Sequence, residues 1–329
     1  MRILFIGLEP PVVSILARQP HNPINTVTSA PKRPYGPGLA GSRASCCNAG
    51  MAGSPTAPHP DDNSEHSNTV ASSPHSAPPP SLTGRVVLVT GGNGGIGLGM
   101  AHGCAQAGAD VVIWGTNQTK LDDAADELAH HGGRVTAHRV DVSDETQVVS
   151  AFADAVANSG RVDAVFANAG VSGGGRFVDQ TLDEWRRVLG VNLEGVFLTL
   201  REGARHMIER GGGGAMVGVS SVSAIHGAPM AQPYAASKAG VIAVMRGLAV
   251  ELARYDIRCN SIVPGWTETE MTEAGRQNDR FLENTTQRTP IRRWGVPDDF
   301  RSVAAFLADP TQVFHTGDEI VLDGGYTRF

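Results

Sequence analysis

Short apolar runs alternate with longer segments of helical spacing from about residue 81 to the end of the chain. The first of these runs, at residues 85–90, is β-branched and shows no polar alternation, which is typical of a strand buried on both faces of a sheet. Strands that alternate with helical segments indicate βαβ units and a parallel sheet. The sequence therefore predicts a single α/β domain with a doubly wound parallel sheet. Predicted strands span residues 85–90, 110–114, 134–140, 163–167, 215–220, 257–263 and 319–322, and predicted helices span 95–107, 118–131, 144–158, 182–210, 233–255 and 297–308.

The N-terminal part of the chain differs from this pattern in composition. Residues 1–80 hold fourteen of the twenty prolines and only two aromatic residues, Phe5 and Tyr35. Such a segment buries too little apolar surface to offset its ordering entropy, so we predict a disordered tail before a folded domain at 81–329. A Glu-Pro-Pro break at residues 9–11 disfavours a signal peptide. A dispensable tail is the preferred interpretation, and an organellar transit peptide stays open.

Charge and cysteine usage narrow the classes of function. The 329 residues are 41% hydrophobic and 18% charged, as in an ordinary globular protein, and the net charge is −6 with no block of Lys or Arg. A nucleic-acid partner is therefore not expected. No apolar run reaches the ~18–20 residues of a membrane span, so no membrane partner is expected. Without ligand spacing in the sequence we predict no metal site, and we expect a reducing, cytoplasmic setting for the four cysteines, Cys46, Cys47, Cys104 and Cys259.

A glycine-rich loop joins the first predicted strand to the first predicted helix. Its sequence, TGGNGGIG, occupies residues 90–97. Glycines allow a backbone to approach a pyrophosphate closely, and the start of the following helix offers unpaired N–H groups and the positive end of its dipole. Glycine also marks ordinary turns, but this loop lies between strand and helix in the first βαβ unit. The sequence therefore predicts a dinucleotide-binding site here.

Several further motifs follow in a fixed order, and together they carry a family resemblance. From residue 82 to about 326 the sequence resembles the conventional short-chain dehydrogenase/reductases, with TGxxxGxG and YxxxK motifs. The resemblance implies a Rossmann-type oxidoreductase domain. The matching motifs are TGGNGGIG at 90–97, Asp141-Val142, ANAG at 167–170, Val191-Asn192-Leu193, Ser220-Ser221, Tyr234-xxx-Lys238, Pro264-Gly265 with Thr269, and Asp323-Gly324-Gly325.

The resemblance implies four catalytic residues. Tyr234 would exchange a proton with the substrate oxygen, and Ser221 would hydrogen-bond the same oxygen. Lys238 would lower the pKa of Tyr234 and bind the ribose hydroxyls, while Asn192 would hold a water that relays protons. The chemistry is sound, because a tyrosine of pKa about 10 needs a nearby positive charge to act near neutral pH. Ser220 competes with Ser221, but the register of the motif favours Ser221.

The implied cofactor is NAD(P)(H), with a slight preference for NADP(H). The position that carries an acid in many NAD-preferring enzymes is Gly115, and neither it nor its two successors bears a charge. Asp141 would accept from the adenine amino group, although a role at the start of the next helix stays open. The expected contacts are Thr90, Gly91, Asn93, Gly95, Ile96, Gly97, Thr116, Asn117, Asp141, Val142, Asn168, Ala169, Gly170, Tyr234, Lys238, Pro264, Gly265 and Thr269.

The substrate side is less defined in the sequence. Residues 266–292 are polar and break helical periodicity, and the resemblance makes them a substrate lid. Candidate pocket residues are Trp266, Met271, Met230, His226, Gln232 and residues 172–177. We expect a small carbonyl or alcohol substrate of the sugar-acid, polyol or 3-oxoacyl type.

Other functions and assemblies remain possible on this fold. The main alternative is a non-catalytic regulator that senses dinucleotides, which would have no need of the four catalytic residues. An epimerase or dehydratase is a further alternative, and an enoyl reductase is disfavoured because its tyrosine and lysine would lie further apart. The resemblance also implies a homo-oligomer, a tetramer or dimer, formed through the helices at 182–210 and 233–255.

Overall fold

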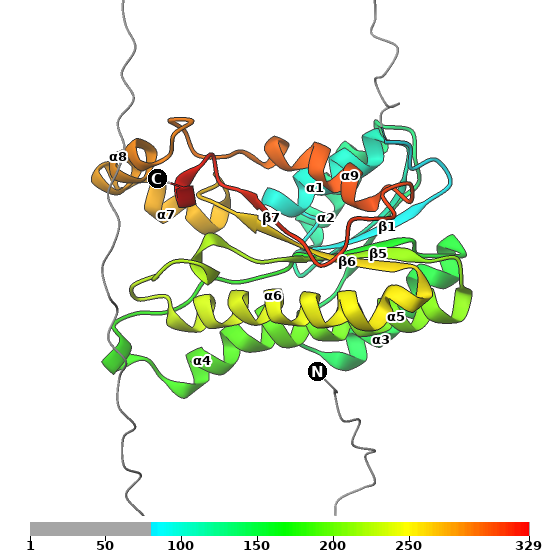
Figure 1. The fold of residues 1–329 in the computed structure, drawn as a ribbon, viewed down its shortest axis with the longest axis horizontal. Helices are drawn as coiled ribbons and strands as arrows, with labels where there is room; N and C mark the ends of the chain where they lie inside the picture. Colours follow the sequence, from blue (N-terminus) through cyan, green and yellow to red (C-terminus); the bar gives the residue numbers. More distant parts are fainter. Residues whose placement is uncertain (1–79, 329) are drawn as a thin grey trace, which may run out of the picture. The chain divides into compact units, whose positions relative to one another are not determined.

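The computed structural model describes residues 80–328, and the predicted tail therefore lies outside the described residues apart from Pro80. The described residues form one parallel sheet with the strand order β3-β2-β1-β4-β5-β6-β7 (Figure 1). The prediction of a doubly wound α/β fold is confirmed. The strands are β1 (Val86–Thr90), β2 (Asp110–Gly115), β3 (Val135–Arg139), β4 (Ala164–Ala167), β5 (Gly214–Val219), β6 (Ile257–Pro264) and β7 (Glu319–Leu322).

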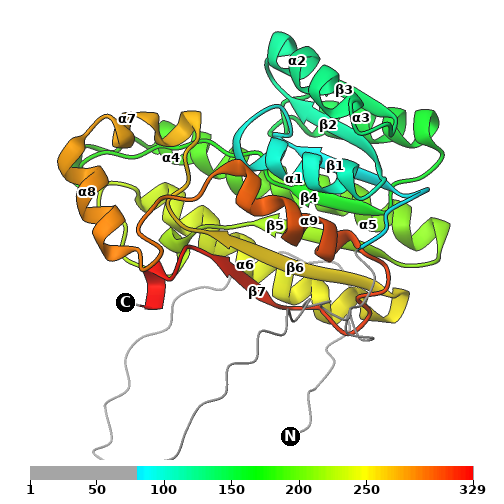
Figure 2. The same ribbon diagram turned by 90° about the horizontal axis from the view of Figure 1, so that it is seen from above.

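Helices cover both faces of the sheet. The two views place α1 (Gly95–Gln106), α2 (Gln118–Ala129) and α9 (Arg301–Ala308) on one face (Figures 1 and 2). On the other face lie α3 (Glu145–Ser159), α5 (Gly195–Arg210) and α6 (Gln232–Leu252). Successive strand residues point to opposite faces, so both must be apolar. In β2, for example, Ile113 packs in the core beneath α1 and α2, whereas Trp114 packs against Phe152 of α3.

The strand order reverses direction between β1 and β4. The first strand pairs with β2 on one side and with β4 on the other. The loop after β1 and the loop after β4 therefore emerge side by side at the carboxyl edge of the sheet. In doubly wound sheets, ligands bind in the crevice at this switch point.

Helix boundaries differ from the predictions in three places. The predicted helix at 182–210 is interrupted by a π-helical turn, Gly190–Glu194, between α4 (Leu182–Leu189) and α5. A 3-10 turn, Pro297–Phe300, opens the helix predicted at 297–308. Residues 266–292, which the sequence predicted to be a lid without helical periodicity, contain α7 (Glu273–Arg276) and α8 (Asp279–Arg288). Both are short and largely exposed, so they need no wide apolar stripe.

Glycines on α1 let α9 approach closely. A Cβ atom on Gly99 would overlap the carbonyl oxygen of Pro297, and one on Gly103 would overlap that of Arg301. Because backbone atoms cannot yield as a flexible side chain can, α1 and α9 would have to separate to admit a methyl group. This contact fixes the helix that starts at the glycine-rich loop. None of the helices within residues 80–328 is long and apolar enough to cross a membrane.

We predict that Gly103→Ala lowers the free energy of unfolding by about 1–3 kcal/mol, the usual cost of overpacking. Gly247→Ala in α6 is the matched control, because nothing lies within 4 Å of a Cβ there. The control should be neutral or stabilising by up to ~1 kcal/mol, as alanine favours helix. Urea unfolding followed by circular dichroism measures both. Equal stabilities of the two variants would contradict the close contact.

Candidate active site

A cleft of about 750 Å³ opens at the carboxyl edge of the sheet. Its lining comes from the loops that follow β1 to β6. All of the cofactor contacts expected from the sequence line this cleft, with the exception of Thr90. Ser221 lines it as well, whereas Asn192 is fully buried behind the wall. The structure thus brings the separate motifs of the sequence into one place.

The glycine-rich loop has the geometry that a dinucleotide requires. A Cβ on Gly97 would overlap the carbonyl oxygen of Gly91, so the loop turns tightly beneath the start of α1. Gly94, by contrast, has nothing within 4 Å of its Cβ position and faces open space. It is the N-cap residue of α1 and has no side chain to bond the first amides of that helix. These free N–H groups at a helix start fit the phosphates of a dinucleotide.

The neighbouring loops at the switch point are tied together by hydrogen bonds. Thr90 is buried, and its Oγ1 accepts from the backbone N–H groups of Asn168 and Ala169, each at 3.0 Å. The Asn168 side chain donates back to the Thr90 carbonyl at 2.9 Å. Thr90 therefore positions the loop after β4 instead of lining the cleft.

Asp141 lies at the far side of the cleft, after β3. Its Oδ1 accepts from the backbone N–H and the hydroxyl of Ser143, at 3.0 and 2.6 Å. Asp144, and not Asp141, caps α3 by accepting from the amides of Thr146 and Gln147. The alternative role for Asp141 as a helix-start residue is therefore wrong.

The side chain of Asn93 lies beside the end of β2. A Cβ on Gly115 would lie 2.6 Å from both Cγ and Oδ1 of Asn93, so the Asn93 side chain already occupies that space. Thr116 and Asn117 also line the cleft. The Asn117 side chain caps α2 by accepting from the amide of Lys120 at 3.1 Å.

Tyr234 and Lys238 lie one turn apart near the start of α6. The Lys238 Nζ is 5.7 Å from the centroid of the Tyr234 ring and donates to the Val219 carbonyl at 2.8 Å. The Ser221 side chain forms a hydrogen bond with the side chain of Tyr234. Ser220 is buried and donates to the Lys238 carbonyl at 2.8 Å. Of the two serines, only Ser221 has its hydroxyl directed to the tyrosine.

Asn192 lies in the π-helical turn between α4 and α5. Its Oδ1 accepts from the Val171 amide at 2.8 Å, and its Nδ2 donates to the Val171 carbonyl and to Ser237 Oγ at 3.0 and 3.2 Å. A Cβ on Gly170 would lie 3.2 Å from Asn192 Oδ1 and 3.4 Å from Lys238 Nζ. Asn192 thus anchors the wall beside Lys238, and π-helical turns are frequent at functional sites.

Comparisons with known proteins agree with this geometry. A family model described as enoyl-(acyl carrier protein) reductase matches residues 91–327. An L-rhamnose 1-dehydrogenase (NAD(P)(+)) of a Sphingomonas species is 36% identical over 74% of this chain and 96% of its own length. A 3-oxoacyl-(acyl-carrier-protein) reductase of Chlamydia pneumoniae is 36% identical over 75% and 98%. A solved gluconate 5-dehydrogenase of Burkholderia cenocepacia, in complex with NADP and tartrate, is 35% identical, covers 76% of this chain and 97% of its own, and superposes with a TM-score of 0.72.

The chain belongs to the short-chain dehydrogenase/reductase family. The resemblance inferred from its motifs is confirmed. Within this family fold, the described residues contain no group of three or more His, Cys, Asp or Glu side chains placed to hold a metal ion.

Burial shifts the pKa values of Tyr234 and Lys238, the two titratable residues near the start of α6. Burial raises the pKa of Tyr234, and the hydrogen bond with Ser221 offsets only part of that rise. Burial lowers the pKa of Lys238 to about 8. The direction for Tyr234 is opposite to the one expected from the sequence, because desolvation of the phenolate outweighs the effect of its neighbours. The phenol is therefore a protonated hydrogen-bond donor at neutral pH.

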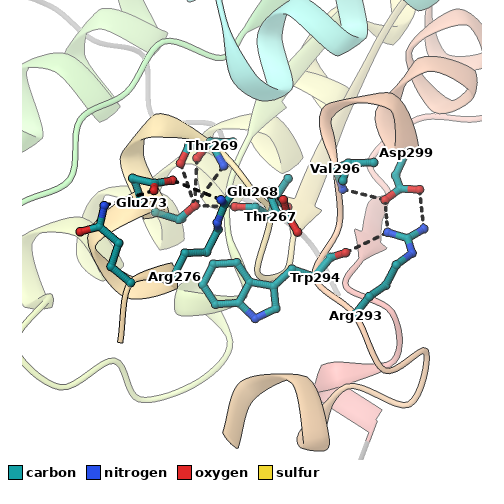
Figure 3. Close-up of polar contacts among 11 residues, drawn as sticks. Thr267, Glu268, Thr269, Glu273, Arg276, Arg293, Trp294, Val296 and Asp299 are labelled. Carbon is teal, nitrogen blue, oxygen red and sulfur yellow. Dashed lines mark hydrogen bonds and ion pairs between the residues drawn. The ribbon is translucent and has the colours of Figure 1, made fainter. Parts of the chain in front are cut away.

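Residues 266–292, the segment predicted to be a substrate lid, make polar and aromatic contacts with one another and with the residues that follow, up to Asp299. Figure 3 shows Thr267 and Thr269 beside the short helix that carries Glu273 and Arg276. Arg276 pairs with Glu268 at 3.0 Å, and Arg293 pairs with Asp299. Residues 269–272 of this segment line the cleft, and Figure 2 shows α7 and α8 beside each other beyond one end of the strands.

The candidate substrate residues fall in four different places. Met271 and Ser172 line the cleft. Trp266 does not, because it stacks on Trp294 at 5.4 Å between centroids and meets the edge of Phe281. His226 and Gln232 line a separate hollow of about 540 Å³. The Met230 side chain is exposed, and its carbonyl accepts from Gly175.

Three charged residues that the sequence analysis did not single out also line the cleft. They are Lys120, Arg187 and Glu270. Arg187 donates to Glu184 and to the Ser172 carbonyl. Lys120 stands in the first turn of α2 and Glu270 directly follows Thr269. The sequence did contain a signal for Lys120 that could have been used, because Lys120 lies about one helical turn after the uncharged residues at the end of β2.

We predict that the Lys238 ammonium titrates with a midpoint near pH 8. The sequence has only three lysines, Lys32, Lys120 and Lys238. Carbon-13 labelling at the lysine Cε therefore yields few NMR signals, and the signal missing in Lys238→Met is that of Lys238. Titration of this signal only above pH 10 would contradict the desolvation seen here.

Proposed function

We propose that this protein is an NAD(P)(H)-dependent oxidoreductase that interconverts a secondary alcohol and a ketone. One observation carries the proposal: Ser221, Tyr234 and the buried Lys238 line the same cleft as the glycine loop, with the Lys238 Nζ 5.7 Å from the centroid of the Tyr234 ring. The printed names of the relatives, which include dehydrogenases and reductases, support the same reaction class.

Tyr234 acts as the proton donor and acceptor in this proposal. In reduction it gives its proton to the carbonyl oxygen, and in oxidation it removes the hydroxyl proton of the alcohol. Its raised pKa keeps the proton on the phenol, which matches the donor role. Ser221 lines the cleft together with Tyr234. Its hydroxyl donates to the same substrate oxygen and stabilises the negative charge that develops there. When bound, the nicotinamide supplies or accepts the hydride.

Lys238 and Asn192 restore the proton on Tyr234. A buried amine with a pKa of about 8 can both hold and release a proton near neutral pH. Lys238 also lines the cleft, where its ammonium is proposed to donate to ribose hydroxyls. Asn192 fixes the wall at Val171 and is proposed to hold the water that connects Lys238 to solvent.

Further features of the proposal concern substrate, cofactor and assembly. We propose a substrate of the sugar-acid, polyol or 3-oxoacyl type, and NADP(H) as the slightly preferred cofactor. Relatives named as gluconate 5-dehydrogenase, one of them bound to NADP, support both points. Residues 266–292 serve as the lid, and α5 and α6 carry the contacts of a homo-oligomer, a tetramer or dimer. Two buried cysteines, Cys104 and Cys259, are compatible with a cytoplasmic enzyme.

A dinucleotide sensor is less well supported. Such a protein needs the glycine loop but not a serine bonded to the tyrosine, and burying Lys238 is costly without a chemical role. The intact pair therefore favours an enzyme over a regulator.

We predict that Tyr234→Phe lowers turnover by about two to four orders of magnitude, the usual contribution of a general acid. Cofactor affinity should change little, because the ring remains in place. Tyr255→Phe, in the turn after α6, is the matched control and should keep full activity. Absorbance of the reduced nicotinamide over a panel of ketones, sugar acids and acyl thioesters gives turnover, and cofactor fluorescence gives affinity. Full activity of the Tyr234 variant would refute the assignment.

We also predict that removing residues 1–80 leaves turnover and Michaelis constants unchanged. Every residue assigned to the cleft lies beyond position 80. Steady-state kinetics of the shortened chain, with circular dichroism to follow folding, tests the proposed division into a tail and a domain at 81–329. Loss of folding on truncation would show that the tail belongs to the domain.

A further inference from the structure

An ion pair joins two distant segments that both line the cleft. Lys120, in the first turn of α2, pairs through its Nζ with Glu270, which lies 150 residues further along the chain. Both residues line the same cleft as Thr116 and Asn117. Glu270 follows Thr269, whose side chain lies against the glycine loop at Gly95. The Lys120–Glu270 pair thus lies at the end of the cleft that is lined by the residues following β2.

Lys120 is the cation best placed to meet an anion at this end. Within residues 80–328 the only two lysines are Lys120 and Lys238, and both line the cleft. Lys238 is committed to the Val219 carbonyl beside Tyr234. Arg187, the remaining cation of the lining, is held by Glu184 on α4. The Nζ of Lys120 bonds only to the exposed carboxylate of Glu270 among the described residues.

The end of β2 cannot itself supply the charge that distinguishes the two nicotinamide dinucleotides. Gly115 has no side chain, the Asn93 side chain occupies the space beside it, and Thr116 and Asn117 are neutral. The 2′-phosphate of NADP(H) needs a cation near this point, whereas the 2′-hydroxyl of NAD(H) is usually held by an acid. One helical turn later, Lys120 provides the cation.

We propose that Lys120 binds the 2′-phosphate of NADP(H), and that Glu270 competes with this phosphate for the Lys120 ammonium. The inference rests on the proposed function. It makes the pair a specificity determinant that permits both cofactors and favours the phosphorylated one. With NAD(H), the ion pair stays closed across the cleft; with NADP(H), Lys120 exchanges the carboxylate for the phosphate.

The exchange is energetically accessible because the ion pair is exposed. The Lys120 side chain is 44% exposed and that of Glu270 is 85% exposed. Such pairs contribute only about 0–1 kcal/mol, so little is lost when the pair opens. A phosphate monoester carries close to two negative charges near neutral pH and offers three acceptor oxygens, against a single charge on Glu270. The phosphate therefore displaces the Glu270 carboxylate from Lys120. The free energy of the Lys120–Glu270 pair is lost in this exchange and lowers the affinity for NADP(H) accordingly.

The test compares the affinities for NADPH and NADH, measured by cofactor fluorescence on the full chain. Lys120→Met should weaken NADPH binding about tenfold, a change of 1.4 kcal/mol, and leave NADH binding within about twofold. Glu270→Gln should tighten NADPH binding several-fold, because the competing charge is gone. Lys120→Arg should restore most of the NADPH affinity lost in Lys120→Met.

Glu273→Gln is the matched control, since Glu273 is an acid of the same segment that pairs with Arg276 and does not line the cleft. It should leave both affinities unchanged. An equal loss of NADPH and NADH affinity in Lys120→Met would overturn the proposal, as would an unchanged NADPH affinity. Arg139 donates to the Thr116 carbonyl, and loss of NADPH preference in Arg139→Gln but not in Lys120→Met would also overturn it.

A second readout does not depend on a variant. Acetylation of Lys120 by an N-hydroxysuccinimide ester, followed by mass spectrometry of the peptide, should be slowed by saturating NADPH and not by saturating NADH. Equal protection by both cofactors would overturn the assignment. If neither NADPH nor NADH binds the wild-type protein, the proposed function itself is contradicted, so the two failures are distinguishable.

Discussion

The parallel direction of all seven strands is the constraint on which the site depends. Because every strand runs the same way, every carboxyl end emerges at one edge, and the reversal of strand order between β1 and β4 opens that edge. Motifs separated by more than a hundred residues, such as the glycine loop and the start of α6, meet there without a long excursion of the chain. The covering helices only need to bury the two faces, and this leaves the loops free for chemistry.

Burial is the second determinant, and it acts on the chemistry directly. Lys238 and Tyr234 are each pushed toward their neutral forms by the same wall of side chains. The protein tolerates the buried amine because it donates to a backbone carbonyl at the end of β5 and is supported from α6. The same hydrogen bond orients the Lys238 amine. The surroundings that shift the pKa values of Lys238 and Tyr234 therefore also position the amine.

The sequence was sufficient to predict the order of strands and helices along the chain and most of the residues that line the cleft. Apolar runs identified the central strands, such as β1, β4 and β6, since burial on both faces leaves a clear pattern there. It was not sufficient for α7 and α8, which rest on a few contacts such as the bond from the Trp294 indole to Thr285. It also missed Lys120 and Glu270, because a pair 150 residues apart has no local signature. Nor could it foresee the direction of the Tyr234 pKa, which depends on how many atoms exclude water.

The contact between Asn93 and Gly115 couples two positions that lie in different loops. A lineage that acquired an acid at 115 first would place its Cβ against the asparagine, whereas one that first shortened residue 93 would have room for the acid. The order of substitution therefore matters, and the two sites are expected to be epistatic. Redesign of the coenzyme requirement at position 115 would accordingly have to move or replace the Asn93 side chain.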